Sequence, residues 1–143
     1  MATNRADRRR QTKVKARPRV YVPVPEEFVD ATGHPWTSVN RDGDTEDFDL
    51  PEVLTHTLRQ APTKSMDDAK RALDVFRMVE QADGYIEMPK DDWDWMMGHL
   101  NDVAHKVWKS IEGAYLVNYL EAAAQTKPPK EEGNGDDDVS DSP

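Results

Sequence analysis

Apolar residues recur at helical spacing in two stretches of the second half of the chain. In the first stretch they recur every three or four positions, which is the pattern of a helix that buries one face. Ser65 fits the N-cap of this helix, with Asp68 in the arrangement of a capping box, and Gly84 fits its C-terminal stop. The pattern predicts a helix over 65–83. Its apolar face consists of Ala69, Leu73, Phe76 and Val79.

The second stretch predicts a longer helix over 92–125. Its apolar residues follow a spacing close to a heptad seam, and Asp91 or Asp92 fits its cap. Gly98 and Gly113 are the expected bends, because glycine is a weak helix former in helix interiors. The residues expected to face the core are Trp93, Met96, Met97, Leu100, Val103, Ala104, Val107, Ile111 and Ala114.

A shorter helix is predicted over 51–60. Pro51 suits the first turn of a helix, and Leu54 and Leu58 lie four residues apart on one face. Pro62 then prevents the helix from continuing.

Two short segments, Tyr21–Val24 and Tyr85–Pro89, contain β-forming residues and are predicted to be extended. They can pair as a minor two-stranded ribbon. Residues 30–49 are rich in turn formers and acids, so we expect a loop there, with Asp42-Gly43 as a tight turn. The predicted fold class is therefore mainly α. An extended segment over 20–49 precedes one small helical domain over 50–125.

Charge is distributed unevenly along the chain. Residues 1–19 contain eight Lys/Arg and one Asp, a formal +7, whereas the whole chain carries −9. The difference leaves −16 on residues 20–143. Both the basic arm (1–19) and the acidic tail (126–143) lack the apolar residues that would offset the entropy of ordering, so both are predicted to be disordered.

The composition favours a soluble intracellular protein. No apolar run approaches the length of a membrane span. The basic start is not followed by the apolar segment of a secretory signal. We therefore expect no membrane partner.

The basic arm has two functional interpretations and one neutral interpretation. Its side chains suit the phosphates of a nucleic acid, with an affinity that depends on salt. They also suit an acidic protein surface, including the body of this protein or of a neighbouring copy. The neutral interpretation is a solvated tail without function. Because the body is acidic, nucleic-acid binding would be confined to the arm. The positive residues of the arm are Arg5, Arg8, Arg9, Arg10, Lys13, Lys15, Arg17 and Arg19.

Aromatic residues in the 92–125 helix indicate a protein interface. Trp108, Tyr115 and Tyr119 form a stripe on a face separate from the expected core. Trp95 lies on another face and has no obvious place in a small core. Trp and Tyr are enriched at protein interfaces, although core packing explains some of these residues equally well. In its simplest form, the interface joins two copies of this chain.

Metal and thiol chemistry find little support. The chain has no cysteine, which excludes disulfides, thiol nucleophiles and Cys-based zinc sites. His99 and His105 are six residues apart and lie on nearly opposite faces of a helix, so they do not form a metal-binding pair. An EF-hand counted from Asp42 fails because its sixth and twelfth positions are Asp47 and Val53.

Catalytic motifs are also lacking. The paired carboxylates at 67–68 and 91–92 are explained by helix starts. The sequence contains no GxGxxG, GxxxxGK[ST] or GxSxG motif. We therefore predict that the protein is not an enzyme and has no cofactor and no metal site.

Two segments resemble small proteins encoded by tailed bacteriophages. The opening MATNRADRRR (residues 1–10) is similar to the starts of many such proteins, including tail-assembly chaperones and other virion-assembly proteins. The segment DGYIEMPKDDW (residues 83–93) resembles their sequence of helix, short extended link, acidic cap, aromatic residue and helix. The resemblance implies a small viral accessory or assembly protein in the host cytoplasm or in the virion, with no catalytic residues to carry over.

Three functional hypotheses follow from the sequence. The first is a non-enzymatic interaction or assembly protein that docks on a larger assembly through the aromatic-rich last helix and the basic arm. The second is a nucleic-acid-binding regulator that uses residues 5–19. The third is an acidic decoy of a nucleic-acid-binding protein, suggested by the −16 of residues 20–143.

Overall fold

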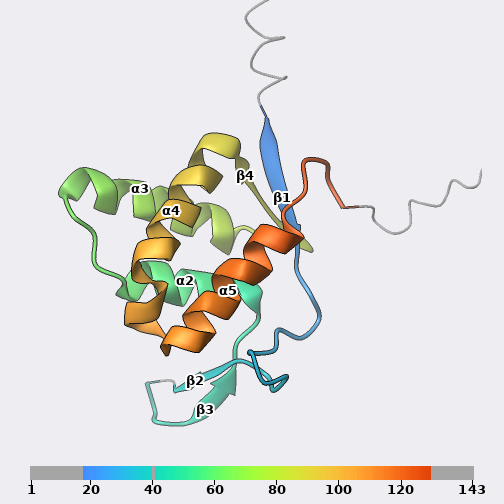
Figure 1. Ribbon diagram of the computed structural model, residues 1–143, viewed down its shortest axis with the longest axis vertical. Helices are drawn as coiled ribbons and strands as arrows, with labels where there is room; N and C mark the ends of the chain where they lie inside the picture. The colour runs from blue at the N-terminus through green and yellow to red at the C-terminus, as the bar shows by residue number, and fades with distance from the viewer. Residues whose placement is uncertain (1–17, 40, 130–143) are drawn as a thin grey trace, which may run out of the picture.

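The computed structural model describes residues 18–39 and 41–129 (Figure 1). In this part of the chain, four helices pack with two small antiparallel sheets of two strands each. The predicted mainly helical class is correct in this coarse form. The helices are α2 (Leu50–Gln60), α3 (Met66–Glu80), α4 (Lys90–Val107) and α5 (Ser110–Ala123). The strands are β1 (Arg19–Pro23), β2 (Thr37–Val39), β3 (Thr45–Asp47) and β4 (Tyr85–Pro89).

Local capping signals explain where α2 and α3 begin. Asp49 and Glu52 form a reciprocal capping box at α2, in which each carboxylate accepts a hydrogen bond of 2.9 Å from the backbone N–H of the other residue. The Ser65 hydroxyl at α3 accepts one of 3.1 Å from the Asp68 N–H. The predicted stop at Gly84 is wrong, because α3 ends at Glu80. Gly84, with a φ of 81°, lies in the turn into β4.

The predicted ribbon forms between β1 and β4, which pair in antiparallel register with Val22 opposite Ile86. Alternate residues of both strands face the core, as the two-residue period of a strand requires. Tyr21 also exchanges two backbone hydrogen bonds with Gln125, of 2.9 and 2.8 Å. The first strand is therefore joined to β4 on one side and to the segment after α5 on the other. The buried residues of the ribbon are Val20, Val22, Ile86 and Met88.

The single helix predicted over 92–125 is wrong, because two helices occupy this region. Trp108 and Lys109 separate α4 from α5 with extended backbone, at ψ values of 167° and 152°. The expected bends are also wrong, since Gly98 and Gly113 lie inside α4 and α5. Figure 1 shows α5 turning back across the molecule beside α4.

Gly113 marks the contact between these two helices. A Cβ atom at this position would lie 3.0 Å from the backbone carbon of Ala104 and 3.0 Å from the backbone nitrogen of His105. A residue without a side chain allows the two backbones to approach this closely. The glycine therefore serves helix packing rather than helix bending.

The start of α4 also differs from the prediction. Asp91 and Asp92 lie in the first turn, while Pro89 occupies the N-cap and makes no side-chain hydrogen bond there. The Lys90 N–H instead donates to the carbonyl of Pro18 at 3.1 Å. A backbone contact with the residue before β1 thus replaces the expected side-chain cap.

The break between α4 and α5 changes which residues face the core. In α4 the expected residues Trp93, Met96, Leu100, Val103 and Ala104 are buried, whereas Met97 and Val107 are half-buried. In α5 the expected residues are wrong, because Ile111 is 69% exposed and Ala114 is also exposed. The two extended residues between the helices turn α5 relative to α4. The spacing of apolar residues in α4 therefore does not continue into α5. The buried residues of α5 are Gly113, Leu116, Val117 and Leu120.

Residues 30–49 contain a hairpin where the sequence predicted only a loop. Strands β2 and β3 pair with Ser38 opposite Glu46. The tight turn predicted at Asp42-Gly43 is confirmed, with a φ of 86° at Gly43. Five of the six strand residues are exposed, so the hairpin has no buried face and no alternating apolar pattern that could indicate it.

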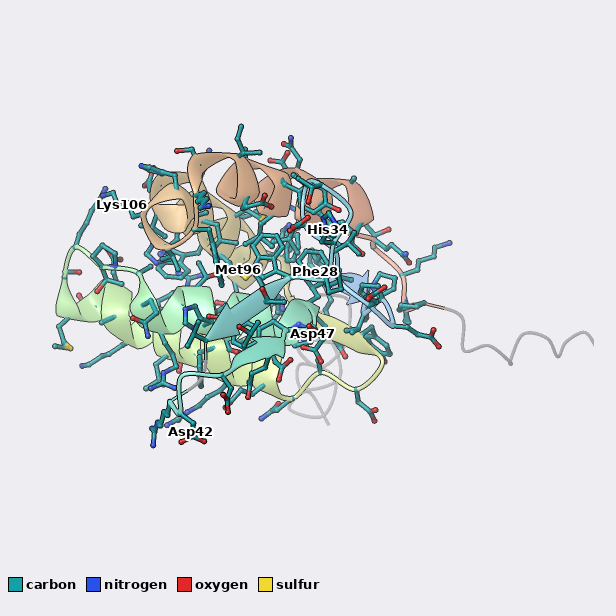
Figure 2. The ribbon with its side chains drawn as sticks, turned by 90° about the horizontal axis from the view of Figure 1, so that it is seen from below. Phe28, His34, Asp42, Asp47, Met96 and Lys106 are labelled. Carbon is teal, nitrogen blue, oxygen red and sulfur yellow. The ribbon has the colours of Figure 1, made fainter. Side chains whose placement is uncertain are left out.

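The helices are arranged in two layers around the core. In Figure 2, α4 and α5 form the upper layer and α2 and α3 the lower one, with Met96 and Phe28 in the interior. Asp42 lies at the far tip of the hairpin. Within the described residues, no helix has both the length and the apolar composition that crossing a membrane requires.

Candidate interaction surface

Three of the four aromatic residues singled out in the sequence contact one another or the same neighbours within the molecule. Trp108 packs edge-on against Trp36, with ring centroids 5.2 Å apart. Tyr119 packs edge-on against Phe28 at 5.0 Å, and Tyr115 lies 6.4 Å from both Trp36 and Tyr119. We call these residues the aromatic cluster: Phe28, Trp36, Trp108, Tyr115 and Tyr119.

A short loop supplies the first two members of the cluster. The Asp30 carboxylate closes this loop by accepting hydrogen bonds from the backbone N–H groups of Thr32 and His34, at 2.9 and 3.1 Å. The hydrogen bond from the Thr32 hydroxyl, at 2.6 Å, is the main cause that lowers the pKa of Asp30. The closed loop fixes the positions of the two residues at its ends.

Those two residues are Phe28 and Trp36, which stack with ring centroids 5.2 Å apart and an angle of 15°. The loop is attached to α5 because the Ala31 N–H donates to the Glu112 carboxylate at 3.0 Å. Figure 2 shows His34, at the same loop, beside α5. The loop therefore covers the aromatic face of α5 that the sequence predicted to be available for a partner.

A hydrogen bond fixes Trp108 against α2. Its indole N–H donates to the Thr57 hydroxyl at 2.7 Å, and the buried Thr57 hydroxyl donates to the Val53 carbonyl at 2.7 Å. The His56 ring lies 5.1 Å from the Trp108 ring, and burial lowers the pKa of His56. Trp108 thus connects the α4–α5 junction to α2.

Trp95 lies apart from the aromatic cluster. It is half-buried on α4 and stacks on His99, with ring centroids 4.8 Å apart and an angle of 17°. The guanidinium of Arg71 from α3 lies 5.9 Å from the Trp95 ring centroid, within cation–π range. Asp92 holds Arg71 in place through an ion pair with an Nη2–Oδ1 distance of 3.1 Å. Residues from two helices therefore position this indole.

The Trp95 side chain lines an open groove of about 760 Å³ between α4 and the segment that joins α2 to α3. Charged residues of both signs surround the aromatic pair, an arrangement that resembles the apolar centre and polar rim of protein interfaces. We call this open groove the Trp95 groove. Its lining residues are Pro62, Thr63, Lys64, Asp68, Asp94, Trp95, Gly98, His99, Asp102, Val103, His105 and Lys106.

His99 presents an unpaired polar atom in this groove. Its Nε2 is buried and has no hydrogen-bond partner among the residues that the structure describes. Burial is the main cause that lowers the pKa of His99, which favours the neutral ring. A neutral imidazole nitrogen either donates or accepts a hydrogen bond, depending on its tautomer.

Sequence reasoning missed the residues that build the groove around Trp95. Arg71 reaches the indole, and residues 62–64 line the same groove, only because α3 packs beside α4, and no local pattern indicates that packing. The contact of His99 with Trp95 could have been predicted, because residues four apart on a helix are neighbours.

Of the positive residues of the arm, only Arg19 lies within the described residues. It begins β1 and forms an ion pair with Glu87 of β4, with an Nε–Oε2 distance of 2.6 Å. Its charge is therefore engaged within the ribbon. Residues 130–143 of the acidic tail also lie outside the described residues, as do Arg5, Arg8, Arg9, Arg10, Lys13, Lys15 and Arg17.

Within 18–39 and 41–129, no group of three or more His, Cys, Asp or Glu side chains is placed to hold a metal ion. The chain was also compared with protein-family models, curated proteins and solved structures, and none of them matches it.

Proposed function

We propose that this is a non-enzymatic interaction protein that docks on a protein partner through the Trp95 groove. One observation carries the proposal. The aromatic cluster packs against other parts of the same chain, whereas Trp95 lines an open groove. Tryptophan is among the residues most enriched at interface hot spots, where it fills a pocket that the partner closes from water.

The groove is organised before a partner arrives. Arg71 and His99 contact the indole of Trp95, and the ion pair with Asp92 fixes Arg71 in turn. A preorganised aromatic side chain loses little conformational entropy on binding, so more of the contact energy contributes to affinity. The lysines and aspartates around the groove favour a partner segment with complementary charges and reject one with like charges.

The resemblance of residues 1–10 and 83–93 to small proteins of tailed bacteriophages suggests which partner to test first. That partner is a component of a virion-assembly complex, in the cytoplasm of an infected host cell or in the virion itself. In this proposal, the basic arm makes a second contact with an acidic surface of the same assembly.

Affinity capture with three baits tests the proposal. The baits are the wild-type protein, Trp95→Ala and Ile111→Ala, and circular dichroism checks that all three are folded. Ile111 is an exposed apolar residue of α5 outside the groove lining, so its variant controls for a general loss of apolar surface. We expect one protein to be recovered with the wild type and the Ile111 variant.

The purified partner then allows the affinities to be measured. We expect Trp95→Ala to weaken the complex by about tenfold or more, as truncation of a hot-spot tryptophan does. Ile111→Ala should bind like the wild type. Equal affinity of all three proteins would show that binding does not use the groove.

A further inference from the structure

Helix α3 has a second apolar face that no described residue of the chain covers fully. Met66 and Leu73 are 69% and 45% exposed, and they share a face with Ala69 and Phe76, which are half-buried. The core side of α3 is instead formed by Ala72, Val75 and Val79. The sequence had predicted that Ala69, Leu73 and Phe76 would face the core together with Val79. That prediction is wrong for Leu73, which is exposed. We call the face formed by Met66, Ala69, Leu73 and Phe76 the apolar stripe.

A shallow groove runs beside this stripe, between α3 and the end of α2. It has a volume of about 370 Å³, and Leu58 and Ala61 form its α2 side while Leu73 and Phe76 form its α3 side. The exposed face is therefore a concave apolar surface rather than a single protruding residue. A second apolar helix would cover it.

The charges beside the stripe indicate which helix that is. Asp67, Lys70, Asp74 and Arg77 are all exposed, and with 100° of rotation per residue they lie along the side of the stripe that faces away from α2. Their signs alternate along the helix. Within the described part of the chain, none of the four forms an ion pair.

This pattern is complementary to itself when a second α3 runs in the opposite direction. Asp67 and Arg77 are equally far from position 72, and so are Lys70 and Asp74. A two-fold axis near position 72 therefore brings Asp67 opposite Arg77 of the other copy, and Lys70 opposite Asp74. A parallel arrangement would instead place the charged edges of the two helices on opposite sides of the seam, where these charges would not face one another.

We propose that a second copy of this chain binds to α3 in an antiparallel, two-fold symmetric pair, with Leu73 near the centre and the four ion pairs along one edge. This inference goes beyond the Trp95 groove. Leu73 and the four charged residues do not line that groove, so either proposal can fail while the other stands.

Sedimentation velocity of the full chain over a range of concentrations tests the proposal. The wild type should show a reversible equilibrium between monomer and dimer. Leu73→Asp should remain monomeric, because it places a charge at the centre of the apolar contact. Ile111→Asp, which alters a more exposed apolar residue on α5, should dimerise like the wild type.

Two charge variants test the antiparallel register. Asp67→Arg sets two arginines against each other across the seam, and Arg77→Asp sets two aspartates against each other. Each variant alone should dimerise about tenfold more weakly than the wild type, since two exposed ion pairs become repulsive. A mixture of the two variants restores all opposite-charge pairs, so it should form a heterodimer of wild-type strength.

Three results would overturn the proposal. The first is a wild-type protein that stays monomeric at every concentration. The second is a dimer that persists in Leu73→Asp, which would place the contact elsewhere on the molecule. The third is a mixture of the charge variants that associates no more strongly than either alone, which would exclude the antiparallel register.

Discussion

At the residue scale, Trp95 and Trp108 are both half-buried but differ in their hydrogen bonding and surroundings. Trp108 donates its indole N–H to Thr57 and contacts the rings of Trp36 and His56. Trp95 has ring contacts with Arg71 and His99 but lines an open groove. The first arrangement joins the α4–α5 junction to α2, and the second leaves Trp95 at the wall of an open groove.

Thr57→Val should lower the free energy of unfolding by about 1–3 kcal/mol, because the variant keeps the shape of the side chain but leaves the Trp108 N–H without its acceptor. Urea unfolding followed by tryptophan fluorescence measures the change. Thr55→Val, on the more exposed side of the same helix, is the control and should change stability much less. Similar losses in both variants would show that the Trp108 hydrogen bond contributes little.

Two histidines make stability depend on pH. Burial lowers the pKa of both His56 and His99 from the ordinary value of 6.5, so the unfolded chain binds protons more readily than the folded one. Protonation therefore favours unfolding, and stability is lost as the pH falls below about 6.5. We expect the free energy of unfolding to decrease between about pH 7 and pH 5.

Phenylalanine at either position keeps a ring in place and removes the titration. His99→Phe and His56→Phe should each flatten the pH dependence in this range, as urea unfolding at a series of pH values would show. The exposed His105→Gln is the control. Parallel pH profiles for all variants would assign the dependence to other groups.

At the element scale, the parts of the fold that could be predicted have local signals. The starts of α2 and α3 follow from Pro51 and from the cap at Ser65. The ribbon follows from two runs of β-forming residues. By contrast, the break at Trp108 and Lys109 has neither glycine nor proline, and it occurs where Trp108 bonds to α2. Tertiary contact overrides helix propensity there.

The candidate site was predictable in part for the same reason. The spacing of apolar residues showed that Trp95 does not belong to the core face of α4. The stripe of Trp108, Tyr115 and Tyr119 assumed one continuous helix, and the covering loop at residues 28–36 depends on the Asp30 carboxylate and on Glu112 of α5. Such long-range contacts leave no periodic pattern in a sequence.

Gly113→Ala should destabilise the protein by about 1–3 kcal/mol, because the new methyl group would meet the backbone of α4 at Ala104 and His105. Gly98→Ala provides the matched comparison. It lies within α4, and a methyl group added there would meet no heavy atom within 4 Å apart from its chain neighbours and the backbone of its own helix, so it should stabilise the helix by about 0.5–1 kcal/mol. Thermal unfolding measures both, and a stabilised Gly113→Ala would contradict the close contact of the helices.

At the scale of the whole molecule, the net charge changes sign along the chain. Residues 1–19 carry a formal +7, while residues 20–143 carry −16. Arg19 is paired with Glu87, so the arm that can be removed without disturbing the ribbon consists of residues 1–17.

Removal of residues 1–17 should abolish any binding to duplex DNA or RNA, because the acidic remainder repels a polyanion. Fluorescence anisotropy titrations at two salt concentrations measure this, and binding by the full chain should weaken as the salt concentration rises. Circular dichroism of the shortened chain provides the folding control. Undiminished binding by the shortened chain would locate a nucleic-acid surface on the body instead.

Strand β1 pairs with β4 and with Gln125, which both come later in the chain. This strand therefore cannot complete its pairing when it is first synthesised. The ribosome makes β1 early, but the partners of this strand follow only after most of the body has been translated, at about 5–20 residues per second. We expect chains stalled on the ribosome before Gln125 emerges to be cleaved by protease near residues 19–23, and early protection would contradict this. The strand that is made first is therefore the last to find all its partners.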